Sequence, residues 1–408
     1  MTNVTDGTRT EGPAWRVPWT AEEGAERATR LFSQAFGYEP SSVTSAPGRL
    51  NVIGEHTDYN AGLALPTVLA HRTFVAAAGR GDGVVRVVTA HAPDEAPQEF
   101  ELGSLAPGAI YGWAAYVGSV LWALQERGFV GGGLDLAVES CVPIAKGLGS
   151  SAALEAAVAL AADSLWGLAL ETPTGRAQLA EACVDGERQF VGVPSGPLDQ
   201  FASLLTVPGA ALILDFASSP PRHWAQPLYF PEYGLGLLVI DSGTTRTHTD
   251  GRYADRVAEC SAAADALGVE TLRQVADAPY ALRRVDAIED PVLRRRARHV
   301  VTEIERTRLV AAELSGTAPA HERFVTIGKA MYRSHASLEI DFEVSTPEQD
   351  ASVDAAFGAG ALGARLVGGG FGGAAIALVR RTQAHRTAEV ISEAMVDQGY
   401  GEPTYLMV

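Results

Sequence analysis

Apolar residues recur at helical spacing in the first half of the chain. Residues 20–37 carry an apolar stripe behind an acidic first turn, and residues 112–128 are also amphipathic. Residues 152–166 are rich in strong helix formers, and a further helix is expected at about 175–191. Because apolar positions three or four residues apart share one face of a helix, this pattern predicts four helices that pack against a core.

Short β-like runs alternate with the helical segments. Between residues 43 and 110 such runs are separated by glycine and proline, and LDLAVES predicts another strand. Downstream, the pattern predicts a strand at LGLLVIDSG, several helices between residues 251 and 336, strands around ARLVGGGFGGAAIALV, and then a helix followed by TYLMV. Strands and helices in this mixed order predict an α+β fold with two cores.

Two segments lack periodicity and bear on domain organisation. Residues 1 to about 15 are polar and are expected to form a frayed tail. The stretch ASSPPRHWAQP, residues 217–227, holds three prolines, so we expect the domain junction there. The expected domains are residues 16–225 and 226–408, and a length of 408 residues agrees with two or three domains.

Charge and cysteine content narrow the possible functions. The chain has 32 basic and 49 acidic residues, a net charge of −17, which argues against a general nucleic-acid binder. Cys141, Cys183 and Cys260 lie far apart without metal-ligand spacing, which indicates free thiols in a reducing compartment and no structural zinc. The N-terminus lacks an apolar signal core, and no apolar run approaches the roughly 18 residues of a membrane span. We therefore expect a cytoplasmic protein with no membrane partner.

The first chemically informative segment is SAPGRLNVIGEHTDYNAGLALP, residues 45–66. It gathers Arg49, Glu55, His56 and Asp58 between apolar runs and glycines. Carboxylates and an imidazole at this spacing offer hydrogen-bond donors and acceptors to a polyol, and the glycines suggest a backbone shaped for close approach. An exposed charged turn is the alternative.

The second segment, PIAKGLGSSAALE at residues 143–155, is a glycine- and serine-rich loop that opens into a long helix. A helix N-terminus presents unpaired N–H groups that suit a phosphate, and Ser150 and Ser151 add hydroxyls. The loop does not match the Walker A pattern. It favours phosphate binding over the alternative of an ordinary serine-capped helix.

Two further segments complete the chemistry. In LVGGGFGGAAIAL, Gly368, Gly370 and Gly373 satisfy G-x-G-x-x-G, but a β-like run follows them instead of a helix, which argues against dinucleotide binding and leaves a tight turn between strands. In GERQFVGVPSGPLDQFAS, Glu187 and Asp199 are either functional or ordinary surface carboxylates. A phosphate loop, spare carboxylates for Mg²⁺ and a hydroxyl, and an arginine together indicate phosphoryl transfer.

These segments carry a family resemblance. GRLNVIGEHTDYNAGLALP resembles the signature of the galactokinases, which belong to the GHMP kinase superfamily. PIAKGLGSSAALE resembles the phosphate loop of that superfamily, GARLVGGGFGGAAIAL its third motif, and SHASLEIDFEVSTPE and RRARHVVTEIERT also look like galactokinase segments. The resemblance runs from about residue 20 to the end. It implies a two-domain α+β architecture of the GHMP kinase type, with the active site in the cleft between the domains.

The resemblance also implies a reaction and its catalytic residues. The expected reaction is ATP-dependent phosphorylation of D-galactose at O1, the first step of galactose catabolism, which gives galactose 1-phosphate and ADP. Asp199 resembles the catalytic base that accepts the O1 proton, and Arg49 its partner, placed to hold that aspartate ionised and to stabilise charge. Glu187, twelve residues before Asp199, matches the Mg²⁺-binding glutamate, and Ser151 is expected to complete the metal site.

The binding residues follow from the same resemblance. Asp58 is expected to read the O3/O4 side of galactose and Glu55 to reach O6. The expected sugar-binding residues in full are Glu55, His56, Asp58, Gly196 and Tyr253. The expected nucleotide-binding residues are Gly147, Leu148, Gly149, Ser150, Ser151, Ala152 and, beside the adenine, Trp113. The expected partners are therefore galactose and MgATP, bound by a monomer.

Departures from the family pattern fall outside the sugar-binding set. The loop reads GLGSSAA where galactokinases more often have GLSSSAA, so Gly149 removes a hydroxyl; WAAY replaces WANY at Ala115, and STPEQD replaces SCPELD. Two other functions remain open. One is a sister sugar 1-kinase for arabinose or N-acetylgalactosamine; the other is a sensor that binds galactose and ATP without catalysis, which the intact Ser150, Ser151, Arg49 and Asp199 disfavour.

Overall fold

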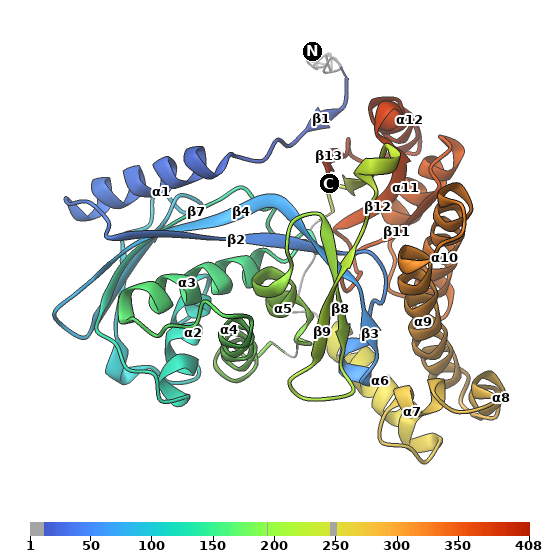
Figure 1. The fold of residues 1–408 in the computed structure, drawn as a ribbon, viewed down its shortest axis with the longest axis horizontal. Coiled ribbons are helices and arrows are strands. Elements are labelled where there is room, and N and C mark those ends of the chain that lie inside the picture. Colours follow the sequence, from blue (N-terminus) through green and yellow to red (C-terminus); the bar gives the residue numbers. More distant parts are fainter. Residues whose placement is uncertain (1–11, 194, 245–250) are drawn as a thin grey trace, which may run out of the picture.

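The computed structural model describes residues 12–193, 195–244 and 251–408. The molecule has two halves, each of which consists of one β-sheet and the helices associated with it (Figure 1). The larger sheet has eight strands in the order β3-β8-β4-β7-β5-β6, with β2 paired to β4 and β9 paired to β8. Its strands are β2 (Ser42–Asn51), β3 (Leu63–Ala64), β4 (Pro66–Gly79), β5 (Val84–Thr89), β6 (Gln98–Glu101), β7 (Leu134–Ser140), β8 (Ala210–Asp215) and β9 (Arg222–Pro227).

Helices cover both faces of the larger sheet. Figure 1 shows α1 on one face, and α2 to α5 gathered on the other. Alanines dominate the buried side of α3, which lets this helix lie close against β2 and β4. These helices are α1 (Ala21–Phe36), α2 (Ala114–Glu126), α3 (Ser150–Trp166), α4 (Pro173–Asp185) and α5 (Leu198–Leu205).

The second sheet has five strands in the order β1-β13-β10-β12-β11, and the last three helices of the chain pack against it. Its strands are β1 (Ala14–Trp15), β10 (Leu235–Asp241), β11 (Gly363–Leu366), β12 (Ala374–Arg380) and β13 (Thr404–Met407). These three helices are α10 (Ala320–Ile340), α11 (Pro347–Gly358) and α12 (Ala384–Asp397). The remaining helices of this half, α6 (Arg252–Ala266), α7 (Leu272–Ala276) and α8 (Ala281–Asp286), pack on α9 (Pro291–Ser315), which in turn packs on α10.

The first described segment of the chain bridges the two halves. Strand β1 pairs in parallel with β13 of the smaller sheet, whereas α1, a few residues later, lies on the larger sheet (Figure 1). The chain leaves the larger sheet at the end of β9, at Pro227, and enters the smaller one at Leu235. The expected boundary at residues 225/226 therefore lies within β9.

Most expected elements are confirmed, and the α+β class with them. Three of the four expected helices in the first half correspond to α1, α2 and α3. The fourth, at about 175–191, divides into α4 and a π-helical turn, η3, which spans Gly186–Val191. The expected tail partly lies outside the described residues (1–11), but Ala14–Trp15 form β1.

Residues 217–227 were expected to form the domain junction, and part of that stretch is a strand, because Arg222–Pro227 form β9. This strand pairs only with β8, so it lies at an edge of the sheet, where a terminal proline removes no ladder hydrogen bond. In the described residues, no helix is long and apolar enough to cross a membrane.

Candidate active site

Two pockets adjoin and share a wall formed by Ser151, Glu187 and Val193. The first, which we call the polar pocket, has a cavity volume of about 100 Å³ and takes residues from both halves of the molecule. It is lined by Arg49, Glu55, His56, Asp58, Ser151, Glu187, Val193, Ser195, Gly196, Leu198, Asp199, Tyr253, Gly368 and Gly369. All the expected catalytic, sugar-binding and metal-binding residues therefore lie around one cavity.

A bidentate ion pair occupies the centre of the polar pocket. Arg49 Nε and Nη2 donate to the two carboxylate oxygens of Asp199 at 2.6 and 2.5 Å. Arg49 Nη1 also donates to the carbonyl of Gly147 in the phosphate loop. Although burial opposes its charge, the carboxylates of Asp199 and Glu55 raise the pKa of Arg49. The guanidinium thus joins strand β2, helix α5 and the phosphate loop at one point.

The carboxylate of Asp58 lies so close to the backbone of Gly196 that a side chain at residue 196 would have to displace it. A Cβ built on Gly196 would stand 1.4 Å from Oδ2 of Asp58. Burial, followed by the charge of Asp199, raises the pKa of Asp58 to about 6. The structure therefore brings together two expected sugar-binding positions separated by more than a hundred residues in the sequence.

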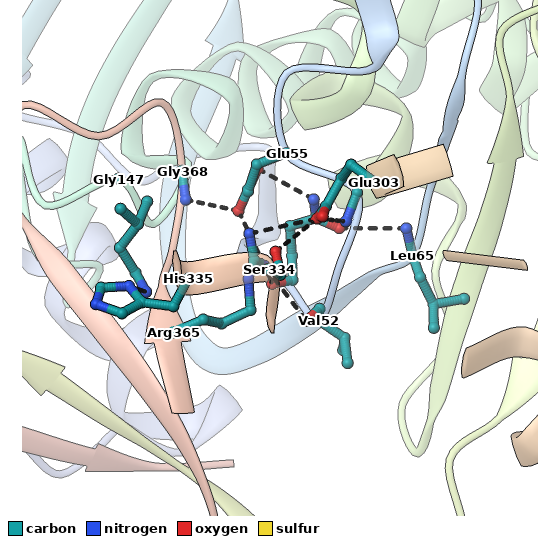
Figure 2. A network of polar contacts seen from close by, with 12 residues as sticks. Val52, Glu55, Leu65, Gly147, Glu303, Ser334, His335, Arg365 and Gly368 are labelled. Atoms are coloured by element: carbon teal, nitrogen blue, oxygen red, sulfur yellow. Dashed lines mark hydrogen bonds and ion pairs between the residues drawn. The ribbon is translucent and has the colours of Figure 1, made fainter. Parts of the chain in front are cut away.

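Buried hydrogen bonds and an ion pair hold the carboxylate of Glu55 in place (Figure 2). The N–H of Gly368 donates to Oε1 at 2.8 Å, Asn51 Nδ2 donates to Oε2 at 3.1 Å, and Nη1 of Arg365 lies 3.5 Å from Oε1. Arg365 is fully buried and also faces Glu303, whose Oε1 lies 3.9 Å from Nη2. Burial raises the pKa of Glu55, and the arginines oppose that shift.

Sequence reasoning missed Arg365 and Glu303. Glu303 Oε1 accepts from the N–H of Gly54 and the hydroxyl of Ser334, so it anchors the loop that carries Glu55 (Figure 2). These contacts join residues about 250 and 310 positions apart. The sequence feature that could have revealed Arg365 is its position inside the apolar run of β11, since arginine is unusual in a buried strand.

Aromatic rings close another side of the polar pocket. His56 has a left-handed φ of 60°, and its Nδ1 lies 2.8 Å from the hydroxyl of Tyr59. Tyr253, at the start of α6, packs 5.5 Å from the ring of His56 and 5.9 Å from the ring of Tyr59, measured between centroids. Tyr59 was not among the expected residues.

Glu187 stands on the π-helical turn η3, at the wall between the pockets. Its Oε2 accepts from Ser195 Oγ at 2.5 Å and from Gln200 Nε2 at 2.8 Å. Its Oε1 faces Ser151 Oγ at 3.5 Å. Burial raises the pKa of this carboxyl, and the hydrogen bond from Ser195 opposes the shift. Carboxylate and hydroxyl oxygens are hard ligands that suit Mg²⁺ together with water and phosphate oxygens, so this donor pair fits that ion.

The phosphate loop ends at the N-terminus of α3, next to the shared wall. Gly147 and Gly149 have φ values of 73° and 71°, and a Cβ on Gly149 would lie 2.9 Å from Cγ of Arg49. Glycine at residue 149 therefore suits both the left-handed backbone and the close approach of Arg49. Of the expected loop residues, Ser150 and Ser151 line the second pocket. The others, Gly147, Leu148, Gly149 and Ala152, lie outside both linings.

The third glycine-rich segment supports the phosphate loop instead of binding a dinucleotide. It is the turn between β11 and β12, as the β-like run after it suggested. The N–H of Ala374 donates to the carbonyl of Lys146 at 3.2 Å, and a Cβ on Gly373 would lie 2.8 Å from that oxygen. Lys146 itself points away, with Nζ 3.1 Å from Asp241 Oδ1.

The second pocket, which we call the apolar pocket, has a cavity volume of about 480 Å³ and belongs to the larger sheet and its helices. Trp113 lines it and donates from Nε1 to Glu95 Oε2 at 3.4 Å. Lining residues that sequence reasoning missed are Thr73, Thr89, His91, Ala92, Glu95, Tyr116, Val138, Ser140, Ile144, Ala145 and Leu154. Its size and its position at the N-terminus of α3 suit a nucleoside attached to phosphates.

Within the described residues, one cluster elsewhere has the spacing of metal ligands: His335, Glu339 and Asp350. His335 Nδ1 accepts from the N–H of Leu366 at 3.3 Å, so in the neutral imidazole Nε2 carries the hydrogen. That nitrogen faces Asp350 Oδ1 at 3.4 Å. His335 lies on α10 and Asp350 on α11, so this contact joins the two helices.

Comparison with known proteins gives three matching family models. The model of the galactokinase galactose-binding signature matches residues 30–79. The model of the GHMP kinase N-terminal domain matches residues 115–206, and that of the C-terminal domain matches residues 314–397.

Whole-chain relatives agree with these models. A galactokinase of Streptomyces coelicolor is 42% identical over 375 residues, covering 91% of this chain and 93% of the relative. A galactokinase of Homo sapiens is 38% identical over 390 residues, covering 93% and 94%. The crystal structure of Lactococcus lactis galactokinase complexed with galactose superposes with a TM-score of 0.84 at 29% identity, covering 94% of this chain and 97% of the other. Methanococcus jannaschii mevalonate kinase shares the fold, with a TM-score of 0.60 at 16% identity, covering 90% and 97%. From these matches, this chain belongs to the galactokinase family, within the GHMP kinase fold.

Proposed function

We propose that this protein transfers the γ-phosphoryl group of MgATP to O1 of D-galactose, giving galactose 1-phosphate and ADP. The observation that carries the proposal is the bidentate Arg49–Asp199 pair, set in a polar pocket that shares a wall with a nucleotide-sized apolar pocket. In this arrangement a sugar hydroxyl beside Asp199 and a phosphate beside Ser151 approach each other across the shared wall. Phosphoryl transfer needs this kind of alignment more than covalent help from the protein.

In the proposed mechanism, Asp199 accepts the O1 proton as the hydroxyl attacks the γ-phosphorus. Arg49 holds the carboxylate by two hydrogen bonds, so its oxygens keep one orientation toward the sugar. The same guanidinium reaches the phosphate loop through Gly147, which places positive charge where negative charge builds up on the transferred group.

Galactose is proposed to lie against Glu55, His56, Asp58, Gly196 and Tyr253. Asp58 is proposed to accept hydrogen bonds from O3 and O4, and Glu55 to reach O6. Gly196 leaves its backbone open to the sugar, since any side chain there would overlap Asp58. The galactose complex of the similar Lactococcus lactis galactokinase supports galactose as the sugar.

The nucleotide is proposed to lie in the apolar pocket, with its base beside Trp113. Its phosphates would meet the N-terminus of α3 and the loop of residues 147–152, including Ser150. Glu187 and Ser151 would hold Mg²⁺, which when bound neutralises charge on the phosphate oxygens.

ADP release with MgATP against a panel of sugars tests the proposal. The panel contains galactose, 2-deoxygalactose, N-acetylgalactosamine, arabinose and glucose. Rapid release with galactose that is lost in Asp199→Asn is the expected result. Release with arabinose or N-acetylgalactosamine alone would assign a sister sugar kinase. If no sugar causes ADP release, although the protein still binds galactose and ATP, the protein would be a sensor.

A further inference from the structure

Three buried polar side chains form a chain of contacts beneath the shared wall. Gln200 is fully buried, and its Nε2 lies 2.8 Å from Glu187 Oε2 and 2.9 Å from Glu155 Oε2. Because both neighbours are carboxylate oxygens, the nitrogen end of the amide faces them, and each of its two N–H groups has one acceptor. Both side-chain N–H groups of Gln200 therefore donate to carboxylates, one to Glu155 and one to Glu187.

These side chains come from elements that also carry the reacting groups. Gln200 directly follows Asp199 in the first turn of α5. Glu155 lies one turn after Ser151 on α3, and residues four apart share a helix face. The first turn of α5 thus carries Asp199 in the polar pocket and Gln200 beneath Glu187. In the same way, α3 carries both Ser151 and Glu155.

The two carboxylate oxygens of Glu187 have different hydrogen-bond partners. Oε2 accepts from Gln200 and Ser195, while Oε1 faces Ser151 on the wall shared by the two pockets. A carboxylate without these donors could turn about its last side-chain bond. With them, one oxygen points at the position proposed for the metal.

A role in positioning Glu187 through Gln200 would explain why a carboxyl group is buried at Glu155. This carboxyl is fully buried near alanines of α3, and within the described residues its Oε1 has no hydrogen-bond partner. The amide oxygen of Gln200 likewise has none. Buried polar atoms without partners are destabilising, so an apolar pair of similar size would stabilise the fold better. The retained polar pair therefore points to a role in the site.

We propose that Gln200 is a positioning residue that holds Glu187 with Oε1 toward the metal, and that Glu155 keeps the amide of Gln200 in place. The inference rests on the proposed role of Glu187 as a metal ligand. Neither Gln200 nor Glu155 touches substrate; both act through Glu187. This arrangement couples the metal site to the helix that carries Asp199.

Metal binding, measured apart from turnover, tests the proposal. Free Mn²⁺ is followed by electron paramagnetic resonance while the ion is titrated into protein with ADP and galactose. Gln200→Met, which keeps the length but removes both donors, should weaken Mn²⁺ binding about tenfold to a hundredfold. Galactose affinity without nucleotide, measured by calorimetry, should change less than about twofold, because the sugar contacts remain. Unchanged Mn²⁺ affinity in Gln200→Met would overturn the proposal.

Gln226→Met is the matched control. Gln226 is also a buried glutamine, but it bonds to Ser315 and Pro227 outside both pockets. The proposal expects wild-type Mn²⁺ binding in this variant. A loss equal to that of Gln200→Met would assign the effect to general destabilisation and would contradict the positioning role.

Substitutions at Glu155 test the second step, and keep the proposal testable if Gln200→Met does not fold. Glu155→Gln retains an oxygen that accepts from Gln200 and should keep most of the Mn²⁺ affinity, whereas Glu155→Leu should lose about tenfold. Equal affinity in the two variants would contradict the role of Glu155.

Glu187→Gln separates this inference from the proposed function. If Glu187→Gln binds Mn²⁺ like wild type, the metal-ligand assignment fails. If Glu187→Gln loses Mn²⁺ binding and Gln200→Met does not, the positioning role fails while the proposed function stands.

Discussion

The polar and apolar pockets meet at one wall but are built in opposite ways. The polar pocket collects charged side chains, including Arg49, Asp58 and Asp199, and the smaller-sheet half adds Tyr253, Gly368 and Gly369 to its lining. The apolar pocket is lined by the larger sheet and its helices alone, mainly with uncharged side chains. A site that pairs buried polar groups with hydroxyls rejects a ligand that lacks them far more strongly than an apolar site does. The difference predicts strict recognition of the sugar and more tolerant recognition of the nucleoside.

The largest effect is expected at the centre of the polar pocket. Asp199→Asn keeps the shape of the side chain but removes the proton acceptor, so kcat should fall about a thousandfold. Galactose and ATP should still bind, because the other contacts remain. Steady-state kinetics and calorimetry measure the two quantities. Turnover near the wild-type rate would show that another group takes the proton.

The next effect is expected in sugar binding. Asp58→Ala removes a half-buried acceptor, and hydrogen bonds to a charged group contribute about 1.5–3 kcal/mol each, so KM for galactose should rise roughly a hundredfold. KM for ATP should stay within about twofold. Gly196→Ala should reproduce the sugar defect, because its methyl group would displace the Asp58 carboxylate. An unchanged KM for galactose in both variants would remove Asp58 from the sugar site.

A smaller effect is expected in the apolar pocket. Trp113→Ala removes one stacking surface, and stacking of an aromatic ring on a base contributes about 1–3 kcal/mol. KM for ATP should therefore rise about tenfold, with KM for galactose unchanged. Kinetics with each substrate varied in turn provide the check. A defect in galactose binding of similar size would mean that the two pockets are not independent.

The smallest effect concerns pH and stability. The pKa of Asp58 is raised from its ordinary value of 3.8 to about 6, so this group binds its proton more tightly in the folded than in the unfolded protein. Its contribution to the free energy of unfolding must therefore fall as pH rises from about 4 to about 6. Urea unfolding across this range should show a shallower loss in Asp58→Asn than in wild type. Trp113→Phe, in the apolar pocket, should keep the wild-type pH dependence.

Local sequence was a good guide to the elements and to the main chemical groups. The segments around Arg49, Glu187 and Asp199 were identified from residue types and family resemblance, and the structure gathers all three around one pocket. The strand β9 was missed because its polar residues, its terminal proline and the two prolines before it resemble a linker; pairing with β8 makes it a strand. The π-helical turn that carries Glu187 also has no local signature that separates it from α-helix.

Residues that act through others were beyond sequence reasoning. Arg365 and Glu303 reach the loop of Glu55 from positions about 310 and 250 residues away. Gln200 and Glu155 lie beside residues that were identified, yet nothing in their own type or spacing marks them as partners of Glu187. Such contacts depend on how distant elements pack, which no short segment encodes by itself.

The sequence by itself determined the family, the order of most helices and strands, and the residues able to carry phosphoryl transfer, because these depend on side-chain type and on periodicity over a few residues. The tertiary structure decided which carboxylate faces which neighbour, why a side chain at residue 196 would displace Asp58, and why the pKa of Asp58 is raised. The reason is physical: burial and electrostatic pairing are set by atoms a few ångströms away in space, and here those atoms come from both halves of the chain.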